Sequence, residues 1–287
     1  MNIGLTEDWL KGMHEDEYGF VNPAFDFNMI QQFDIARGYQ LHHLKCIQQA
    51  PRISKAPLDD LGRHGFDLRP ILEPKFADGL ADRVKAAGRN VYPGDMEKAE
   101  VEGVLNAVFS PSVHAMVNRY FLTEFAVIFF GLLHTRPLAE QEDPNTPSVS
   151  FGWHCDGGPM KHLKMLIYLN SSDEHDGATD YLDSTATALF KKTGYVFCPI
   201  HLRLQDLSGL AELNGIPYEP RRLRPDRGEG ITFEPAGVLH KGVYPTRGVR
   251  CVLQIGIIPW PVSWQQFFAQ NYELLVNNTG SGFPKLN

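Results

Sequence analysis

Two histidines and one aspartate in this chain have the residue types and spacing of a metal site. His154 and Asp156 stand two residues apart in the segment SFGWHCD, and His240 lies much later, in the short β-like run FEPAGVLHKG. If SFGWHCD is a strand, its side chains alternate between faces, so His154 and Asp156 point to the same side. Two imidazoles and one carboxylate can hold iron(II) and leave three coordination positions open for a co-substrate and oxygen.

Arg250 is a second candidate, ten residues after His240, at the start of the apolar run RCVLQIGIIP. Strand alternation predicts one face with Arg250, Val252, Gln254 and Gly256, and another with Cys251, Leu253, Ile255 and Ile257. Burying an unpaired cation is costly, so the guanidinium requires an anionic partner. Because guanidinium and carboxylate pair through two parallel hydrogen bonds, a dicarboxylate co-substrate would be suitable.

The elements that must position these residues are short strands. From residue 123 onward, Gly, Pro, Asp and Asn separate β-like runs, which are FAVIFFGLL, VSFGWHCD, KMLIYLN, GATDYLD, GYVFCPIHLRL, GITFEPAG and RCVLQIGIIP. Many short strands without interleaved long helices favour an antiparallel sandwich or jelly roll over a doubly wound parallel sheet. The predicted fold class is therefore mainly β with flanking α-helices.

Helical spacing dominates before residue 123. It predicts helices over 74–87, after Asp95, and over 111–121, where Ser110 is the expected N-cap and Pro111 begins the first turn. The apolar stripe expected on the first helix consists of Phe76, Leu80, Val84 and Ala87. We expect these helices to support the sheet.

The C-terminal segment is predicted to form an amphipathic helix. Ser263 and Gln266 fit a capping box, and apolar residues continue at helical spacing to Leu275. Its aromatic face is expected to pack against the sheet, with a membrane surface or the second subunit of a homodimer as alternatives. The chain is thus predicted to be a single domain over 1–287, with a mainly helical part at 1–122, the β core at 123–260, and a helix and tail at 261–287.

The composition excludes several classes of protein. Of the 287 residues, 43% are hydrophobic and 21% charged, which is typical of an ordered globular chain. The formal charge of −7 opposes attraction to phosphate backbones, so nucleic acid is not expected as a partner. Four separated cysteines and an N-terminus without a secretory pattern favour the cytoplasm. No apolar run reaches the roughly 20 residues of a transmembrane helix.

The order of the candidate residues resembles a known enzyme family. His154-Cys155-Asp156, His240 and Arg250 reproduce the H-x-D…H…R motif of iron(II)/2-oxoglutarate-dependent dioxygenases. The ten-residue step from His240 to Arg250 is usual in the phytanoyl-CoA dioxygenase-like branch. The resemblance covers about residues 100 to 260. It implies a double-stranded β-helix, a distorted and cupin-like jelly roll with the metal at its open mouth.

The resemblance also implies cofactors and a reaction. His154, Asp156 and His240 would be the catalytic iron(II) ligands, and Arg250 would bind the distal carboxylate of 2-oxoglutarate. With O2 as the other co-substrate, 2-oxoglutarate would be decarboxylated to succinate while an unactivated carbon of a small molecule is hydroxylated. Asp156 fills the position that a halide takes in related halogenases, so hydroxylation is favoured over halogenation.

Two positions depart from the family pattern. YLDSTATALFKKTGY stands where relatives commonly carry a P-G-S-H-like segment, so the substrate side is unfamiliar. Val252 stands two residues after Arg250, where some relatives have a hydroxyl residue. Another group must then help to bind the co-substrate, and Tyr168 in KMLIYLN is the candidate.

Several alternatives stay open. The same ligands could serve a cupin-like isomerase or lyase that does not use 2-oxoglutarate, or the chain could be a non-catalytic β-sandwich that binds a small ligand or a protein. The arginine cluster of YEPRRLRPDRGEG is either a solvated loop or a site that captures an anionic substrate; it consists of Arg221, Arg222, Arg224 and Arg227. His162 and His175 either reach the substrate or are polar loop residues. The loop EQEDPNTPS and the stretch 191–230 are candidate lids.

Overall fold

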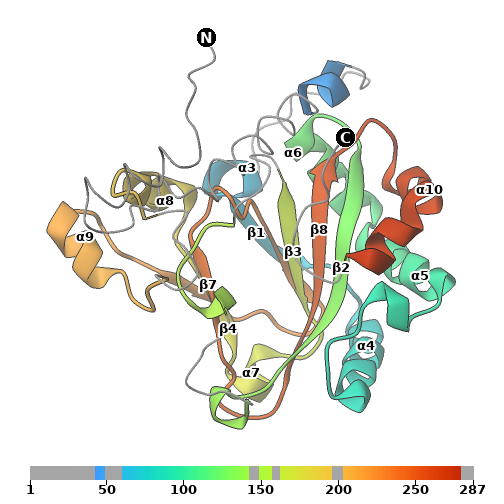
Figure 1. Ribbon diagram of the computed structural model, residues 1–287, viewed down its shortest axis with the longest axis horizontal. Coiled ribbons are helices and arrows are strands. Elements are labelled where there is room, and N and C mark those ends of the chain that lie inside the picture. The colour runs from blue at the N-terminus through green and yellow to red at the C-terminus, as the bar shows by residue number, and fades with distance from the viewer. Residues whose placement is uncertain (1–42, 49–59, 142–148, 157–161, 196–202, 279–287) are drawn as a thin grey trace, which may run out of the picture.

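Two antiparallel sheets form the centre of the protein (Figure 1). The computed structural model describes residues 43–48, 60–141, 149–156, 162–195 and 203–278. The larger sheet contains, in spatial order, β1 (Phe66–Pro70), β6 (Glu229–Phe233), β3 (Leu163–Tyr168), β8 (Arg250–Pro259) and β2 (Phe125–Thr135). The smaller sheet contains β5 (Arg221–Leu223), β4 (Ala178–Tyr181) and β7 (His240–Val243). The mainly β architecture with flanking helices agrees with the prediction.

Helices flank both sheets (Figure 1). Those beside the larger sheet are α3 (Asp60–His64), α4 (Pro74–Ala87), α5 (Lys98–Val108), α6 (Pro111–Phe121) and α10 (Trp264–Asn277). The others are α7 (Ser172–His175), α8 (Ser184–Lys191) and α9 (Ser208–Asn214), together with the short 3-10 helices η2 (Pro93–Asp95), η3 (Leu138–Glu140) and η4 (Val149–Phe151). Among the described residues, no helix is both long and apolar enough to cross a bilayer.

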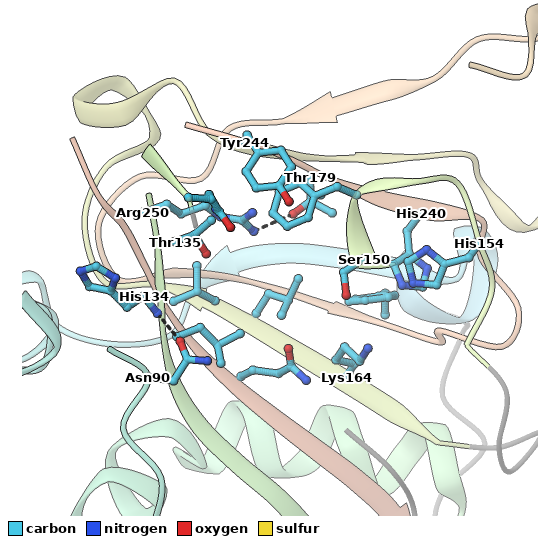
Figure 2. Close-up of a pocket in the computed structure, with 18 residues that line it drawn as sticks. Asn90, His134, Thr135, Ser150, His154, Lys164, Thr179, His240, Tyr244 and Arg250 are labelled. Atoms are coloured by element: carbon cyan, nitrogen blue, oxygen red, sulfur yellow. Dashed lines mark hydrogen bonds between the residues drawn. The ribbon is translucent and has the colours of Figure 1, made fainter. Parts of the chain in front are cut away.

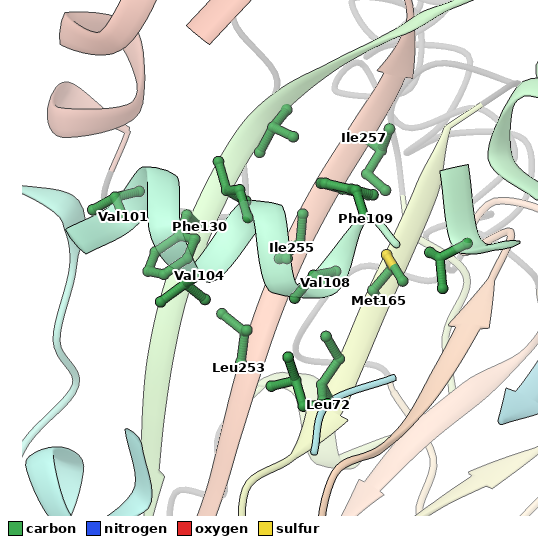
Figure 3. Packing of buried hydrophobic residues seen from close by; sticks show 14 of the residues in the cluster. Leu72, Val101, Val104, Val108, Phe109, Phe130, Met165, Leu253, Ile255 and Ile257 are labelled. Carbon is green, nitrogen blue, oxygen red and sulfur yellow. The ribbon is translucent and has the colours of Figure 1, made fainter. Parts of the chain in front are cut away.

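The alternation predicted for β8 is present, and it separates the core from the site. Cys251, Leu253, Ile255 and Ile257 belong to the main apolar core, whereas Val252 faces the space between the two sheets. Figure 3 shows Val101, Val104 and Val108 of α5 lying over Phe130, Leu253 and Ile255 of β2 and β8. Because one face of the larger sheet is covered by helices, the other is left to form a pocket.

The predicted C-terminal helix packs on the sheet as expected. Trp264 and Phe268 of α10 join the main core, and Phe267 packs with Ile128 and Ile258 of β2 and β8. The Ser263 hydroxyl accepts a hydrogen bond from the Gln266 N–H at 3.3 Å, which caps the first turn. This helix therefore stabilises the outer edge of the larger sheet, at β2.

Two local predictions are wrong, and a third lies outside the described residues. The expected stripe of α4 is displaced, because Phe76 and Ala87 are exposed and Ala77 and Ala81 are buried with Leu80 and Val84. SFGWHCD is not a strand: residues 149–151 form η4, and His154 makes an isolated bridge to His240. The run GYVFCPIHLRL and parts of both candidate lids fall on residues 142–148 and 196–202, which are not described.

The departure from a strand at SFGWHCD has a physical reason. The N–H groups of Trp153, His154 and Asp156 donate to the carbonyls of Leu204, His240 and Pro235, respectively. Since these acceptors belong to three separate segments, no ladder with one partner strand can form. The segment is instead held at three points, which fix the backbone on both sides of His154.

Candidate metal site and pocket

His154, Asp156 and His240 lie together. One ligand atom from each residue can be chosen so that all lie within 4.8 Å of one another. Oδ1 of Asp156 is 3.3 Å from Nε2 of His154 and 3.9 Å from Nε2 of His240. Three donor atoms converging at this distance can coordinate one metal ion between them.

Backbone contacts set the positions of the two histidines. The His154 N–H donates to the His240 carbonyl at 3.1 Å, and the His240 N–H donates to the His154 carbonyl at 3.0 Å. The imidazole centroids are 4.4 Å apart as a result. His240 is the first residue of β7 in the smaller sheet. The bridge therefore holds the irregular segment around His154 against the smaller sheet.

The hydrogen bonds of the imidazoles leave one nitrogen of each ring for a metal ion. Nδ1 of His154 contacts the Gly152 carbonyl at 2.7 Å, and Nδ1 of His240 contacts the Val238 carbonyl at 2.9 Å. A carbonyl accepts only from a protonated nitrogen, so Nε2 of each neutral ring carries the free lone pair. Burial and the adjacent His154 hold the pKa of His240 well below its usual range, which favours this neutral form.

Asp156 is ionised. Burial raises its pKa, but the ion pair with Lys164 and the contacts with the two histidines outweigh burial and bring the pKa well below its usual range. Lys164 was not singled out from the sequence, although a lysine in the apolar run KMLIYLN was a usable signal. The residues present thus fit a divalent cation: two neutral imidazoles and one carboxylate, each with a second hydrogen-bond partner.

A pocket of about 330 Å³ between the two sheets joins this cluster to Arg250. Figure 2 shows His154 and His240 at one end, and Arg250 with Thr179 at the other. The other polar residues that line it are Asn90, His134, Thr135, Gln141, Ser150, Lys164, Tyr244 and Gln254. Lys164 also lines the pocket, but its ammonium pairs with Asp156, so Arg250 is the cation whose end of the described pocket favours an anionic group.

Arg250 is buried with neutral partners. It is 7% exposed, and its Nη2 donates to the Thr179 hydroxyl at 3.1 Å. Its guanidinium carbon lies 5.0 Å from the centre of the Tyr168 ring. In the described part of the chain no carboxylate pairs with Arg250, and its Nε has no hydrogen-bond partner. A buried cation without a counter-ion can bind an anion.

The structure places Tyr168 behind this site rather than in it. Tyr168 is fully buried and does not line the pocket, but its hydroxyl contacts the Thr179 hydroxyl at 3.0 Å. Thr179, on β4, does line the pocket, and sequence reasoning missed it. Val252 has no hydroxyl group, but Thr179 supplies one beside Arg250 from the opposite sheet.

The aromatic residues beside His154 and the two further histidine candidates lie in different parts of the fold. Trp153 is buried among Leu182, Phe190 and Leu239, whereas Phe151 lines the pocket and stacks on Tyr244 with ring centroids 3.5 Å apart. His162 and His175 are buried and neither lines this pocket.

The side chains of the arginine cluster contact residues outside the pocket. Arg222 pairs with Asp180 at 2.7 Å, Arg224 with Asp176 at 3.0 Å, and Arg227 with Asp78 at 3.0 Å. Arg221 lies against the Phe66 ring, and none of these four arginines lines the pocket. These contacts favour a role in holding loops over capture of a substrate.

His175 is expected to make a pH-dependent contribution to the free energy of unfolding. Nδ1 of this buried ring accepts the Gly177 N–H at 2.9 Å; burial and the nearby Arg250 lower its pKa from 6.5 to about 4. The unfolded chain takes up this proton first as the pH falls, so the contribution is complete above pH 6.5 and is lost progressively toward pH 4. The loss amounts to about 3 kcal/mol.

A non-titrating variant isolates this effect. His175→Asn keeps an acceptor near Nδ1 but has no proton to gain, so its free energy of unfolding should fall less than that of the native protein between pH 6.5 and pH 4. Urea unfolding of both proteins at several pH values measures the difference. Parallel pH profiles would show that His175 does not carry the effect.

The chain shares its fold with solved structures of EctD from S. alaskensis. The structure of EctD with 2-oxoglutarate and 5-hydroxyectoine has a TM-score of 0.52 at 14% identity, over 73% of this chain and 79% of EctD. EctD with bound Fe has a TM-score of 0.50 at 16% identity, over 73% and 80%. No protein-family model matches the chain, and no curated protein matches its sequence. The likeness confirms the predicted double-stranded β-helix fold.

Proposed function

We propose that this protein is a non-haem iron(II)/2-oxoglutarate-dependent dioxygenase that hydroxylates an unactivated carbon of a small molecule. The observation that carries the proposal is the pocket, which has His154 and His240 of the three-residue cluster at one end and Arg250, without an acidic partner in the described chain, at the other. A ligand that chelates a metal through one end and carries a carboxylate at the other would satisfy both ends. EctD, whose structures hold 2-oxoglutarate or Fe, supports the choice of this ligand.

In this proposal each side chain has a distinct task. Nε2 of His154, Nε2 of His240 and Oδ1 of Asp156 bind the metal, and Arg250 with Thr179 binds the distal carboxylate of 2-oxoglutarate. Tyr168 positions Thr179 through the hydroxyl contact. When bound, iron and 2-oxoglutarate supply the oxidising chemistry, in which 2-oxoglutarate and O2 yield succinate and carbon dioxide while the substrate gains a hydroxyl group.

The finer classification is also a proposal. We infer membership of the phytanoyl-CoA dioxygenase-like branch from the ten-residue step between His240 and Arg250. We infer a small substrate, because the pocket between the sheets is about 330 Å³. The described lining does not favour an anionic group on it, since Lys164 pairs with Asp156 and Arg250 is assigned to 2-oxoglutarate. The net charge of −7 is consistent with the absence of a nucleic acid partner.

The test is succinate formation from 2-oxoglutarate. We expect the native protein with iron(II), 2-oxoglutarate and O2 to form succinate, and omission of any one of the three to stop it. Adding fractionated small metabolites should identify the substrate as a compound that accelerates succinate formation and gains one oxygen atom. Metal binding without consumption of 2-oxoglutarate would contradict the proposal and favour a cupin-like enzyme that acts on its substrate without this co-substrate.

A further inference from the structure

The three side chains proposed to bind the metal differ in the hydrogen-bond partner that orients each of them. His154 and His240 are each oriented by a backbone carbonyl, that of Gly152 or Val238. Asp156 has a side-chain partner, because its Oδ2 accepts a hydrogen bond from the Lys164 ammonium while its Oδ1 faces the two imidazoles. The two oxygens of one carboxylate are thus divided between the metal position and a lysine.

Lys164 is well placed to act as a fixed support. It lies on β3 between β6 and β8, opposite Phe233 on one side and Gly256 on the other. Its side chain is 15% exposed, so the ammonium is held close to Asp156 rather than free in solvent. Asp156 itself lies outside any strand and is fixed through its N–H, which donates to the Pro235 carbonyl at 2.8 Å.

We propose that Lys164 positions the metal site, by holding Oδ2 of Asp156 so that only Oδ1 is presented to the ion. This inference rests on the proposed function. A carboxylate that bound through both oxygens would take one of the positions that the co-substrate and oxygen require. Lys164 therefore keeps the coordination sphere open, and it acts through Asp156 rather than as a ligand of the ion.

Metal binding by the protein without co-substrate tests this role. An ammonium that acted only as a nearby charge would repel the ion, so Lys164→Met would tighten binding. An ammonium that orients the ligand has the opposite effect: Lys164→Met should weaken Co(II) binding by about 10-fold or more, the usual cost of losing such a partner. Lys164→Arg should bind close to native affinity, because a guanidinium can also donate to Oδ2.

Two comparisons separate positioning from general damage to the structure. Lys241→Met is the matched control, since Lys241 follows His240 and is 17% exposed but donates to the Gln205 carbonyl. It should bind Co(II) as the native protein does. In an Asp156→Asn background, Lys164→Met should change the affinity by less than about threefold, because the carboxylate through which it acts is gone.

The outcomes distinguish this inference from the function on which it rests. If the native protein binds Co(II) and Lys164→Met binds it equally or more tightly, the positioning role is wrong and the proposed function stands. If Lys164→Met weakens binding equally in the native and Asp156→Asn backgrounds, the role is structural and the inference is also wrong. If the native protein does not bind Co(II) at all, both fail.

Discussion

Arg250→Met should lower the affinity for 2-oxoglutarate by about 100-fold or more, because removing one partner of a buried charge pair costs about 3 kcal/mol. Iron(II) affinity should stay unchanged, since Arg250 contacts none of the three metal-binding residues. The variant should also be at least as stable as the native protein without ligand, because it loses a buried cation that has no acidic partner in the described chain.

Equilibrium binding of 2-oxoglutarate to the metal-loaded protein measures this effect. Arg247→Met is the control, since Arg247 lies three residues earlier, is 64% exposed and pairs with Asp176 away from the pocket. It should bind 2-oxoglutarate normally. Native affinity in Arg250→Met would remove the main reason for choosing a dicarboxylate co-substrate.

Asp156→Ala should reduce succinate formation by roughly 1,000-fold, since a metal ion contributes several kcal/mol to catalysis and this variant lacks the anionic ligand. The metal affinity should fall as well, because two neutral imidazoles remain to bind a divalent cation, with Lys164 left unpaired beside them. Succinate measured at saturating iron(II) and 2-oxoglutarate reports the loss in turnover, and metal titration reports the loss in binding.

Asp176→Ala provides the comparison for this change. Asp176 is also an aspartate paired with basic side chains, here Arg224 and Arg247, but it lies outside the pocket. Its removal should leave both metal affinity and succinate formation near native values. Substantial succinate formation by Asp156→Ala would mean that this carboxylate is not part of the reaction centre.

Regular alternation made much of the larger sheet predictable. The run RCVLQIGIIP forms β8 with the expected bounds, and its odd-numbered residues from Cys251 to Ile257 enter the core. The motif spacing also predicted that His154, Asp156 and His240 meet, and they do. Their roles as ligands stay predictions, as does the single-domain organisation of residues 1–287.

Contacts between separate elements were not predictable in the same way. SFGWHCD has a strand-like pattern, yet its N–H groups bond to three different segments, which no local pattern encodes. Thr179 meets Arg250 across the two sheets, and Lys164 meets Asp156 from a different element. Such pairings depend on how the sheets pack, so the sequence indicated Tyr168 but not the Thr179 hydroxyl that lies between it and the pocket.

The central prediction is that iron(II) binds to His154, Asp156 and His240, and that 2-oxoglutarate extends from this ion through the pocket to Arg250. Anaerobic visible absorption tests it most directly, with iron(II) added first and 2-oxoglutarate second. We predict a charge-transfer band in the native protein that is absent in His240→Ala and strongly weakened in Arg250→Met at the same 2-oxoglutarate concentration. A native protein that binds iron(II) but shows no such band at any 2-oxoglutarate concentration would contradict the account.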